Sequence, residues 1–463
     1  MPADKQHKIR TLWVTGVLHA FTHMYQVALL PLYLQIQRDL RLSSVEQATL
    51  LVSVMGAAYF FPSYPMGVLA DRWSRKKLLG SGLAINAVGF IALSFAPSYG
   101  WAVACVVLAG FGGSFYHPSA TALIARLFPE GRGRALGWVG AGASVGFFVG
   151  PLYCGWRAVA TGNWREPVLE VGIFGLVAAG IFAALAEEER PSADRTGRGD
   201  ESSAGPQSFQ VSTPNLPGKR GSSGLAVDSL PRPLQGAKKK SLFPTAALWL
   251  LFFGASLALS MRDFTGSAMA TSASLFLQNA HGFTPKSAGW ALSGIYVASA
   301  ISNPLFGHLS DGGRMRWAAV LLLLSACMVM VFPRVSVGGM GPVLVVFGFL
   351  FMATYPITEA ALMEAVPDAV RGRVFGLFIT IGGFLGNLAH WVVGDWVRRL
   401  GAGAALPGRY LPLYTTLSGM LLVSLLGLVC LKAIKKRELA AEALTTQKES
   451  ALSGSAAELA ALQ

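Results

Sequence analysis

The sequence predicts an all-α membrane protein with twelve transmembrane helices arranged in two pseudo-symmetric halves of six. Three observations lead to this prediction: an apolar composition, twelve apolar runs of spanning length, and an internal repeat. Hydrophobic residues make up 53% of the 463 residues and charged residues only 13%, whereas about a quarter of the residues of a soluble protein are charged. The mean hydropathy is +0.49. A chain of this composition belongs in a lipid bilayer.

The cysteines and the net charge exclude other classes of protein. The four cysteines lie inside apolar runs, without the paired or metal-ligand spacing of a disulfide or zinc site. We therefore expect no metal and no cofactor. The formal net charge of +14 comes mostly from short basic segments beside apolar runs, where cations fix orientation in a bilayer. This distribution argues against a nucleic-acid partner.

Twelve apolar runs approach the roughly 20 residues that a helix needs to cross about 30 Å of hydrocarbon. They lie at 11–36, 47–70, 78–96, 101–125, 134–156, 168–186, 244–278, 286–309, 317–333, 342–366, 373–394 and 410–434. The run at 244–278 is long for one span. Its polar patch at 260–267 predicts a bent or locally broken helix.

The segments between the runs define the organisation of the chain. Residues 187–243 are rich in Ser, Gly, Pro and mixed charge, and such a segment cannot bury enough apolar surface to order itself. It predicts a flexible cytoplasmic linker between an N-terminal half at 1–186 and a C-terminal half at 244–437. The tail at 438–463 has a composition that permits a helix, but we expect a loosely ordered cytoplasmic extension.

The basic connections alternate so that all of them can lie on one side of the membrane. Because such connections stay inside, we expect both termini in the cytoplasm and the protein in a bacterial inner membrane. Some of the arginines in outward connections are expected to pair with Glu166, Glu170 or Asp395. These arginines are Arg157, Arg165, Arg398, Arg399 and Arg409.

The two halves repeat each other. Laying Pro118 over Pro356 aligns "YHPSATALIARLFPEGRGRALG" at 116–137 with "TYPITEAALMEAVPDAVRGRVFG" at 354–376. The tripeptide Arg-Gly-Arg then recurs after one inserted residue. Two copies of a six-span unit, related by a pseudo-twofold axis along the membrane normal, indicate a transporter.

Several motifs resemble those of the major facilitator superfamily. "GVLADRWSRKKLL" at 67–79 is similar to its signature loop between spans two and three, and "GHLSDGGRMR" at 307–316 is similar to the weaker counterpart. "GASVGFFVGPLYCG" at 142–155 resembles the fifth-span motif of its antiporters. "LHAFTHMYQVALLPLYL" at 18–34, with "GFGGSFYHPSATALIA" at 110–125, most resembles the fosmidomycin-resistance efflux group. The chain departs from that group at His23, where an acidic residue is usual.

The resemblance implies a set of gating residues. Asp71 at the end of a span can accept hydrogen bonds from a neighbouring helix N-terminus or pair with an arginine, and such a contact would latch the halves together. The alternative is that the basic loop is only a topology signal. The candidate gating residues are Gly67, Asp71, Arg72, Arg75, Arg126, Gly146, Gly150, Pro151, Gly307, Asp311 and Glu364.

Polar side chains within the spans form the candidate site, because an ionisable group in the membrane is costly and rarely retained without use. His19 and His23 share a helix face and would bind protons or an anion, or else hydrogen bond to adjacent helices. Arg262 needs water or a counter-charge, so a fixed lock to Glu359 or Asp263 is the alternative to a substrate role. The candidate substrate or proton-binding residues are His19, His23, Gln26, Tyr116, His117, Arg262, Asp263, Glu359, Asn387 and His390.

These features predict a secondary transporter working by alternating access and not an enzyme, since the chain has no phosphate-cradling GxxxxGK[ST] loop. The resemblance implies proton-coupled efflux of a small organic compound by a monomer in the lipid bilayer. The alternative is a proton- or ion-coupled importer of a small anionic metabolite. A receptor or scaffold that does not transport is a third, weaker hypothesis.

Overall fold

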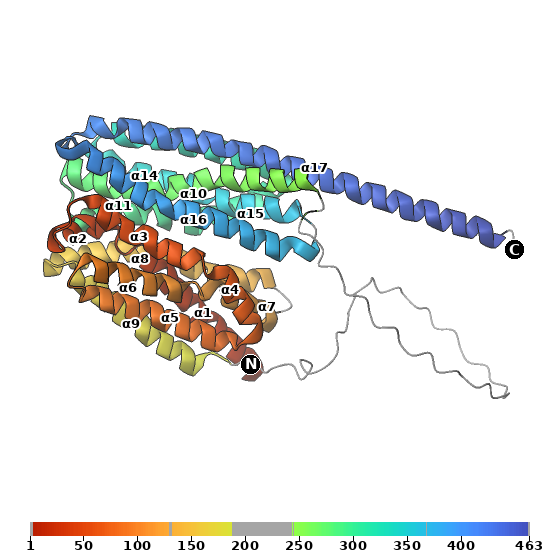
Figure 1. The fold of residues 1–463 in the computed structure, drawn as a ribbon, viewed down its shortest axis with the longest axis horizontal. Helices are drawn as coiled ribbons and strands as arrows, with labels where there is room; N and C mark the ends of the chain where they lie inside the picture. Colours follow the sequence, from red (N-terminus) through yellow and green to blue (C-terminus); the bar gives the residue numbers. More distant parts are fainter. Residues whose placement is uncertain (1–2, 129–131, 188–242, 244, 367, 462–463) are drawn as a thin grey trace. The chain divides into compact units, whose positions relative to one another are not determined.

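The computed structural model describes residues 3–128, 132–187, 243, 245–366 and 368–461, which form helices joined by short connections (Figure 1). The described residues before and after the predicted linker form one compact unit. The predicted linker at 187–243 lies almost wholly outside the described residues.

The N-terminal half contains the helices of spans one to six. Its first expected run, 11–36, is not one helix: α1 ends at Val27 and a 3₁₀ turn follows, with Pro31 inside it. Proline has no N–H to continue a helix ladder, so the prediction of one continuous span was wrong there. The elements are α1 (Ala3–Val27), η1 (Leu30–Leu32), α2 (Tyr33–Asp39), α3 (Val45–Phe60), α4 (Ser63–Arg72), α5 (Arg75–Ser94), α6 (Tyr99–Gly113), α7 (Tyr116–Leu127), α8 (Arg132–Thr161) and α9 (Arg165–Leu185).

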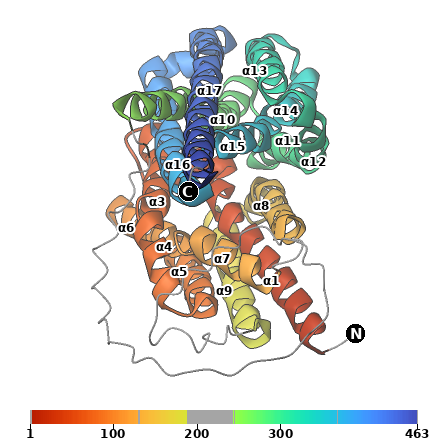
Figure 2. The same ribbon diagram turned by 90° about the vertical axis from the view of Figure 1, so that its right-hand side faces the viewer.

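The C-terminal half contains spans seven to twelve, and Figure 2 shows its helices as a second group beside the first. The elements are α10 (Ala246–His281), α11 (Pro285–Val297), α12 (Ser299–Leu309), η3 (Ser310–Gly312), α13 (Arg314–Val331), η4 (Phe332–Arg334), α14 (Val337–Met352), α15 (Thr354–Glu364), α16 (Asp368–Leu400), η5 (Gly401–Ala405), η6 (Pro407–Tyr410) and α17 (Leu411–Ala461).

Helices stand at each of the twelve expected positions. Among the described residues, 9 helical stretches are long and apolar enough to cross a membrane. The remaining three positions hold α1, which begins with polar residues, and two pairs that are each interrupted: α3 with α4, and α11 with α12. The all-α membrane fold predicted from the sequence is confirmed.

The seventh span is one continuous helix of 36 residues, so of the bend or local break predicted at 260–267 the break is absent. The polar side chains of this patch make hydrogen bonds without interrupting the helix. The hydroxyl of Ser260 donates to the carbonyl of Ser256 at 2.6 Å, and Thr265 donates to Met261 at 2.8 Å. Such back-bonding lets a helix carry hydroxyl side chains through an apolar environment.

The C-terminal tail also differs from its prediction. Instead of a loosely ordered extension, α17 continues without interruption to Ala461. The segment 438–453 contains Ala, Leu, Glu and Lys but neither Gly nor Pro, and these are strong helix formers. A helix that has already begun in the membrane needs no new nucleus to extend through them.

The internal repeat reappears in the helix breaks. Spans four and ten are both interrupted, between α6 and α7 and between α14 and α15. Pro118 is the third residue of α7, and Pro356 is the third residue of α15. Proline is tolerated in a first turn, where its missing N–H would have no partner in the helix. The duplicated sequence therefore folds into duplicated elements.

The halves pack against each other through two helix pairs, α3 with α16 and α8 with α11. Glycines permit this close approach: a side chain at Gly56 would overlap Asn387, and one at Gly289 would overlap the backbone of Pro151. The Ser53 hydroxyl donates to the Asn387 carbonyl at 2.6 Å across the first pair. Small residues at such crossings are typical of membrane helices, which gain stability by close packing.

Candidate functional site

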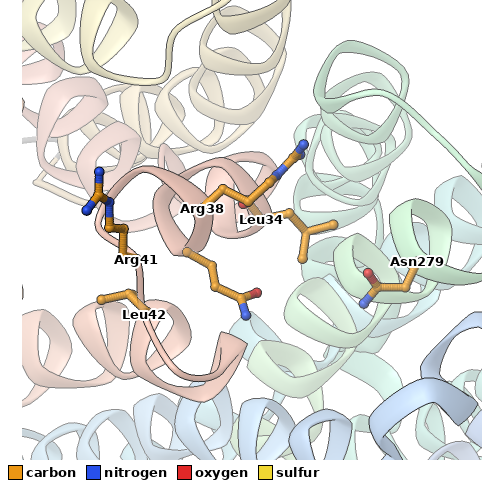
Figure 3. A pocket seen from close by; sticks show the side chains of 6 residues that line it. Leu34, Arg38, Arg41, Leu42 and Asn279 are labelled. Atoms are coloured by element: carbon orange, nitrogen blue, oxygen red, sulfur yellow. The ribbon is translucent and has the colours of Figure 1, made fainter.

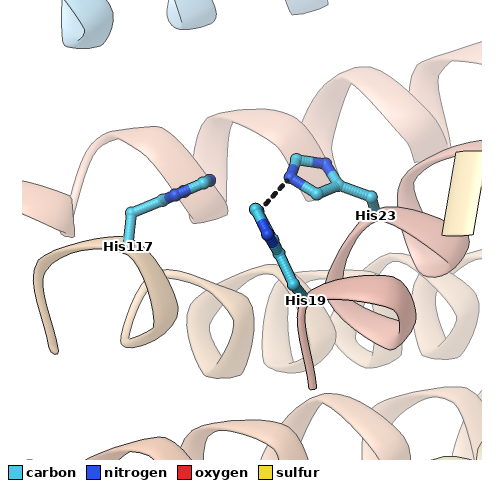
Figure 4. A group of neighbouring side chains, drawn as sticks. All are labelled: His19, His23 and His117. Atoms are coloured by element: carbon cyan, nitrogen blue, oxygen red, sulfur yellow. Dashed lines mark hydrogen bonds between the residues drawn. The ribbon is translucent and has the colours of Figure 1, made fainter. Parts of the chain in front are cut away.

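Three histidines converge inside the N-terminal half. His19 and His23 lie one turn apart on α1, and His117 lies in the first turn of α7 (Figure 4). The Nε2 atoms of His19 and His23 are 3.0 Å apart. One ring nitrogen from each of the three histidines lies within 4.8 Å of the others. The sequence predicted the first pair from its spacing, but only the fold brings His117 to it.

Neighbouring groups fix the orientation of these imidazoles. Nδ1 of His19 lies 2.8 Å from the carbonyl oxygen of Val139, and Nδ1 of His23 lies 3.1 Å from Oε1 of Gln26. The ring of Tyr116 stacks on His19 with centroids 4.6 Å apart, while its hydroxyl donates to the carbonyl of Thr15. Gln26 and Tyr116, both predicted as site residues, therefore support the histidine cluster.

A charged cluster occupies the C-terminal half. Arg262 on α10 is only 1% exposed and pairs with Asp263, with Nη2 and Oδ1 2.8 Å apart. Its Nη1 donates to Oγ1 of Thr358 at 2.6 Å, and its guanidinium lies 4.0 Å from the ring centroid of Tyr355. The carboxyl group of Glu359 interacts electrostatically with both members of the pair.

This geometry identifies the charged partner of Arg262. Adjacent side chains on an ideal helix point about 100° apart, so the sequence did not require a pair. The flexible arginine chain nevertheless folds back, and Nε and Nη2 both reach Asp263. Burial of an uncompensated charge is costly, and the nearest carboxylate offsets part of that cost. The partner of Arg262 is Asp263, with Glu359 as a further neighbour.

The two clusters occupy equivalent places in the repeat. Each half carries polar residues on its first long helix, α1 or α10, and on the short helix that begins two residues before the aligned proline. His117 precedes Pro118 as Tyr355 precedes Pro356. The contact of Tyr355 with Arg262 was not predicted from the sequence. The alignment of Tyr355 with His117 was the signal that could have identified it.

Aromatic side chains connect the clusters across the interface of the halves. The ring of Tyr59 lies 6.0 Å from His117 and 4.9 Å from Phe60. A side chain at Gly383 would overlap Phe60, and one at the preceding Gly382 would overlap Asp263. The path from the histidines to the buried ion pair is therefore short, and it crosses from α3 to α16.

Asn387 and His390 contact the other half directly. The side chain of Asn387 lies against Gly56 on α3, and its amide donates to the carbonyl of Gly383 within α16. Nδ1 of His390 is hydrogen bonded to Thr271 on α10 and lies 3.5 Å from the hydroxyl of Tyr33 on α2. These two predicted site residues lie in the packed interface of the halves and not in either cluster.

The predicted gating glycines lie at helix crossings in the fifth span. Side chains at Gly146 or Gly150 would meet the backbone of α1, and the carbonyl of Pro151 faces Gly289 on α11. Gly67 lies beside Pro118, whereas nothing lies within 4 Å of the position of a side chain at Gly307.

The charged gating candidates lie at or near helix ends. Glu364 accepts from Nε of Arg314 at 2.6 Å and from Nζ of Lys435 at 3.0 Å, which ties together three spans of one half. Arg75 is buried at the start of α5, whereas Arg72 is exposed. Arg126 lies in the last turn of α7. The predicted latch residues Asp71 and Asp311 have side chains outside the described part of the structure.

The expected ion pairs of the outward connections are present in part. Arg157 pairs with Glu170, and both Arg398 and Arg399 pair with Asp395. Arg398 also reaches Glu46 of the other half, with Nε and Oε2 2.6 Å apart. Arg165 departs from the expectation because it pairs with Asp39 at the end of α2.

A pocket of about 510 Å³ lies apart from both clusters, at the end of the helices where the halves touch (Figure 3). Basic residues Arg38 and Arg41 line it together with Asn279 from α10. Arg41 has a positive φ of 51°, a conformation that is uncommon for residues other than glycine. The pocket contains no member of the predicted site.

A bundle of membrane helices in two repeated halves, with polar clusters inside each half, defines an integral membrane transporter. The chain belongs to the Major Facilitator Superfamily, whose family model matches residues 12–390. It is a transporter and not an enzyme.

Similar proteins bear the names of resistance proteins. The chain is 23% identical to a fosmidomycin resistance protein of Escherichia coli over 83% of its length and 85% of that protein. It is 26% identical to multidrug resistance protein 2 of Bacillus subtilis over 73% of the chain and 76% of that protein. A 31% identical match to the multidrug resistance efflux pump PmrA of Streptococcus pneumoniae spans 39% of the chain and only 45% of the pump.

The fold is also found among solved structures. An inward-facing, unoccupied bacterial homologue of the human lysosomal transporter Spinster superposes with a TM-score of 0.65 at 18% identity. The match covers 93% of this chain and 96% of that one. At this identity the likeness concerns the fold alone.

Proposed function

We propose that this protein is a proton-coupled exporter of a small organic compound that works by alternating access as a monomer. The observation that supports this most is the buried charged cluster of Arg262, Asp263 and Glu359 beside the interface of the halves. Charges inside a membrane protein are rarely retained without use. Relatives named for multidrug and fosmidomycin resistance support the outward direction.

Glu359 is the proposed proton carrier. It is only partly exposed and stands beside an ion pair whose charges already balance. Adding a negative charge to a balanced, buried pair costs free energy in a low-dielectric site. Binding and release of one proton at Glu359 would therefore change the net charge of the cluster. In an alternating-access cycle the cluster would take up the proton on one side of the membrane and release it on the other.

The substrate is proposed to bind between the two clusters, against Tyr59 and Phe60. On one side stand the imidazoles of the N-terminal half and on the other the charged cluster of the C-terminal half. Asn387 and His390 would form the packed wall of this region. Import of an anionic metabolite has less support, because the positive charge of Arg262 is already paired with Asp263.

The gate arrangement is proposed from the contacts between the halves. Hydrogen bonds and the Glu46 to Arg398 ion pair join the ends of α3 and α16, whereas Phe61 and Tyr64 are 79% and 72% exposed. The structure would then be open toward the loop at 72–75, which the basic connections assign to the cytoplasm. Asp71 and Asp311 would close that side in the other state.

Orientation has a direct test. Lys77→Cys and Arg316→Cys should react with a membrane-impermeant maleimide only in inside-out vesicles, whereas Lys286→Cys should react only in intact cells. Labelling of residues 77 and 316 from opposite sides would overturn the proposed topology and the cytoplasmic termini.

The transport proposal is tested in proteoliposomes that contain purified protein and a pH-sensitive dye. Fosmidomycin, the compound in the name of one relative, is the first of a panel. With an acidic lumen, uptake of a substrate by antiport should make the lumen more alkaline, and the signal should be absent from protein-free vesicles. Acidification with substrate would instead establish symport. If compounds bind without any flux, the protein is a receptor and the proposal fails.

A further inference from the structure

The histidine cluster has a feature that substrate binding does not require. Its three ring nitrogens lie within 4.8 Å of one another, and they come from two helices that are distant in sequence. Figure 4 shows the rings of His19, His23 and His117 turned toward a common point. Side chains from α1 and α7 therefore have the convergent arrangement of ligands around a small ion.

The hydrogen bonds of the cluster determine which nitrogen atoms carry protons. A carbonyl oxygen only accepts, so Nδ1 of His19 donates to Val139. Nδ1 of His23 likewise donates to Oε1 of Gln26. In a neutral imidazole the other nitrogen then holds a bare lone pair. With the Gln26 amide in its observed orientation, two lone pairs face each other 3.0 Å apart.

Two facing lone pairs repel unless a cation lies between them. Around a tetrahedral metal ion with metal to nitrogen distances of about 2.0–2.1 Å, ligand nitrogens are separated by about 3.3 Å. The distance of 3.0 Å between the two Nε2 atoms is close to that value. The ligand nitrogen of His117 lies within 4.8 Å of the other two and would have to move closer to reach the same separation.

A metal ion fits this site better than a shared proton does. A proton joins two nitrogens and leaves the third histidine without a function, whereas a metal ion uses all three. The outer hydrogen bonds to Val139 and Gln26 match the pattern of metal-binding histidines, which donate their second N–H to an oxygen that fixes the ring. The hydroxyl of Tyr59, whose ring lies 6.0 Å from that of His117, has no hydrogen-bond partner among the described residues.

We propose that His19, His23 and His117 bind one divalent transition-metal ion inside the N-terminal half. Three neutral imidazoles favour the borderline ions Zn²⁺, Ni²⁺, Co²⁺ and Cu²⁺ over Mg²⁺ and Ca²⁺, which prefer oxygen. The proposal revises the expectation of no metal, which was based on cysteine spacing. Metal binding can be measured without transport, although the same imidazoles border the proposed substrate site.

The test uses the purified full-length protein with a tag that contains no histidine. Zn²⁺ is titrated by calorimetry, and Co²⁺ is added to follow the visible absorption of a tetrahedral nitrogen site. We expect one ion per chain. His23→Gln and His117→Asn should each weaken Zn²⁺ binding at least tenfold, and Gln26→Met should weaken it about tenfold through loss of ring orientation.

His390→Gln is the matched control, because it removes a buried histidine outside the cluster. Its affinity for Zn²⁺ should equal that of the unmodified protein. Size-exclusion profiles and thermal unfolding establish that each variant is folded. Failure of the unmodified protein to bind Zn²⁺ or Co²⁺, or equal binding by all the cluster variants, would overturn the proposal and indicate a neutral hydrogen-bonded trio.

Discussion

Arg262 shows how a single residue is accommodated inside a membrane helix. Its guanidinium is 1% exposed, yet it has a carboxylate, a hydroxyl and an aromatic face as partners. Each partner offsets part of the cost of removing a charge from water. The residue is therefore a stable part of the C-terminal half, and its neighbours determine its electrostatic role.

Removing the carboxylate tests this balance. Asp263→Asn should lower the free energy of unfolding by about 3 kcal/mol, because it leaves a buried guanidinium without its counter-charge. Thermal unfolding in detergent, followed by a thiol-reactive or intrinsic fluorescence signal, measures the change. Asp395→Asn, which affects more exposed ion pairs, should cost less than about 1 kcal/mol. Equal losses in the two variants would contradict the assignment.

Glu359 is the residue on which proton coupling depends. Glu359→Gln keeps the size of the side chain but cannot release a proton. Transport driven by a pH gradient should fall at least tenfold, while exchange of substrate across vesicles at equal pH should continue. Glu166→Gln, at an exposed acidic position on α9, should leave both rates unchanged. If Glu359→Gln transported normally under a pH gradient, Glu359 would not be the proton carrier.

At the residue scale the sequence identifies the polar positions but not their partners. His19, His23, Arg262 and Asp263 stand out because ionisable residues are rare in apolar runs. The contact of His117 with the first pair depends on the packing of α1 against α7, which no local spacing encodes. Carbonyl partners such as that of Val139 have no signal at all, since every residue has a carbonyl group.

At the scale of elements, glycines determine how closely helices approach. On α8, Gly142 and Gly146 rest on the backbone of Gly16 and Ala20, so α1 and α8 are in direct contact. Membrane helices gain stability from such packing because the lipid offers no hydrophobic drive between them. The fifth-span motif therefore has a structural function in this state.

A matched pair of substitutions on α8 tests this contact. Gly146→Ala should destabilise the protein by about 2 kcal/mol, because the new methyl group overlaps the carbonyl of Ala20 and forces α1 away. Gly140→Ala lies on the same helix with nothing within 4 Å of the added carbon, so its stability should be unchanged or slightly higher. Thermal unfolding of both variants decides, and an unchanged Gly146→Ala would show that α1 is free to shift.

Helix positions follow from the sequence more closely than helix continuity does. Apolar runs located the twelve spans, because crossing a bilayer requires a minimum length of apolar helix. The break after Val27 was not predicted, and the local break that was one of two alternatives for α10 is absent. A helix stays continuous where each polar side chain finds a hydrogen-bond partner. Ser260 uses a backbone carbonyl of its own helix, and Arg262 uses the side chains of Asp263 and Thr358. Composition alone does not reveal such partners.

At the scale of the whole unit, the halves contact each other along α3 and α16 near one end of the bundle. A side chain at Gly394 of α16 would overlap Thr49 of α3, with its Cβ 3.1 Å from the threonine Cβ. Disulfides join cysteines with Cβ atoms about 3.5–4.5 Å apart. A Cβ at position 394 would also come within 2.9 Å of the Cα of Glu46, so a cross-link between the halves requires α16 to move away from α3.

The cross-link tests alternating access. Thr49→Cys with Gly394→Cys, made with the accessible Cys327 and Cys430 replaced by serine, should lose more than tenfold of its transport on oxidation and regain it on reduction. Thr49→Cys alone should be insensitive to oxidant. Full transport by the oxidised double variant would show that this end of the interface stays closed throughout the cycle.

The length of α17 has a mechanical consequence. At 1.5 Å per residue its 51 residues extend about 76 Å, more than twice the roughly 30 Å of hydrocarbon. Much of this rod must project into water, rigidly joined to the C-terminal half. Any tilt of that half is magnified at the far tip as by a lever arm, so a fluorophore there would report the angular swing of the working cycle.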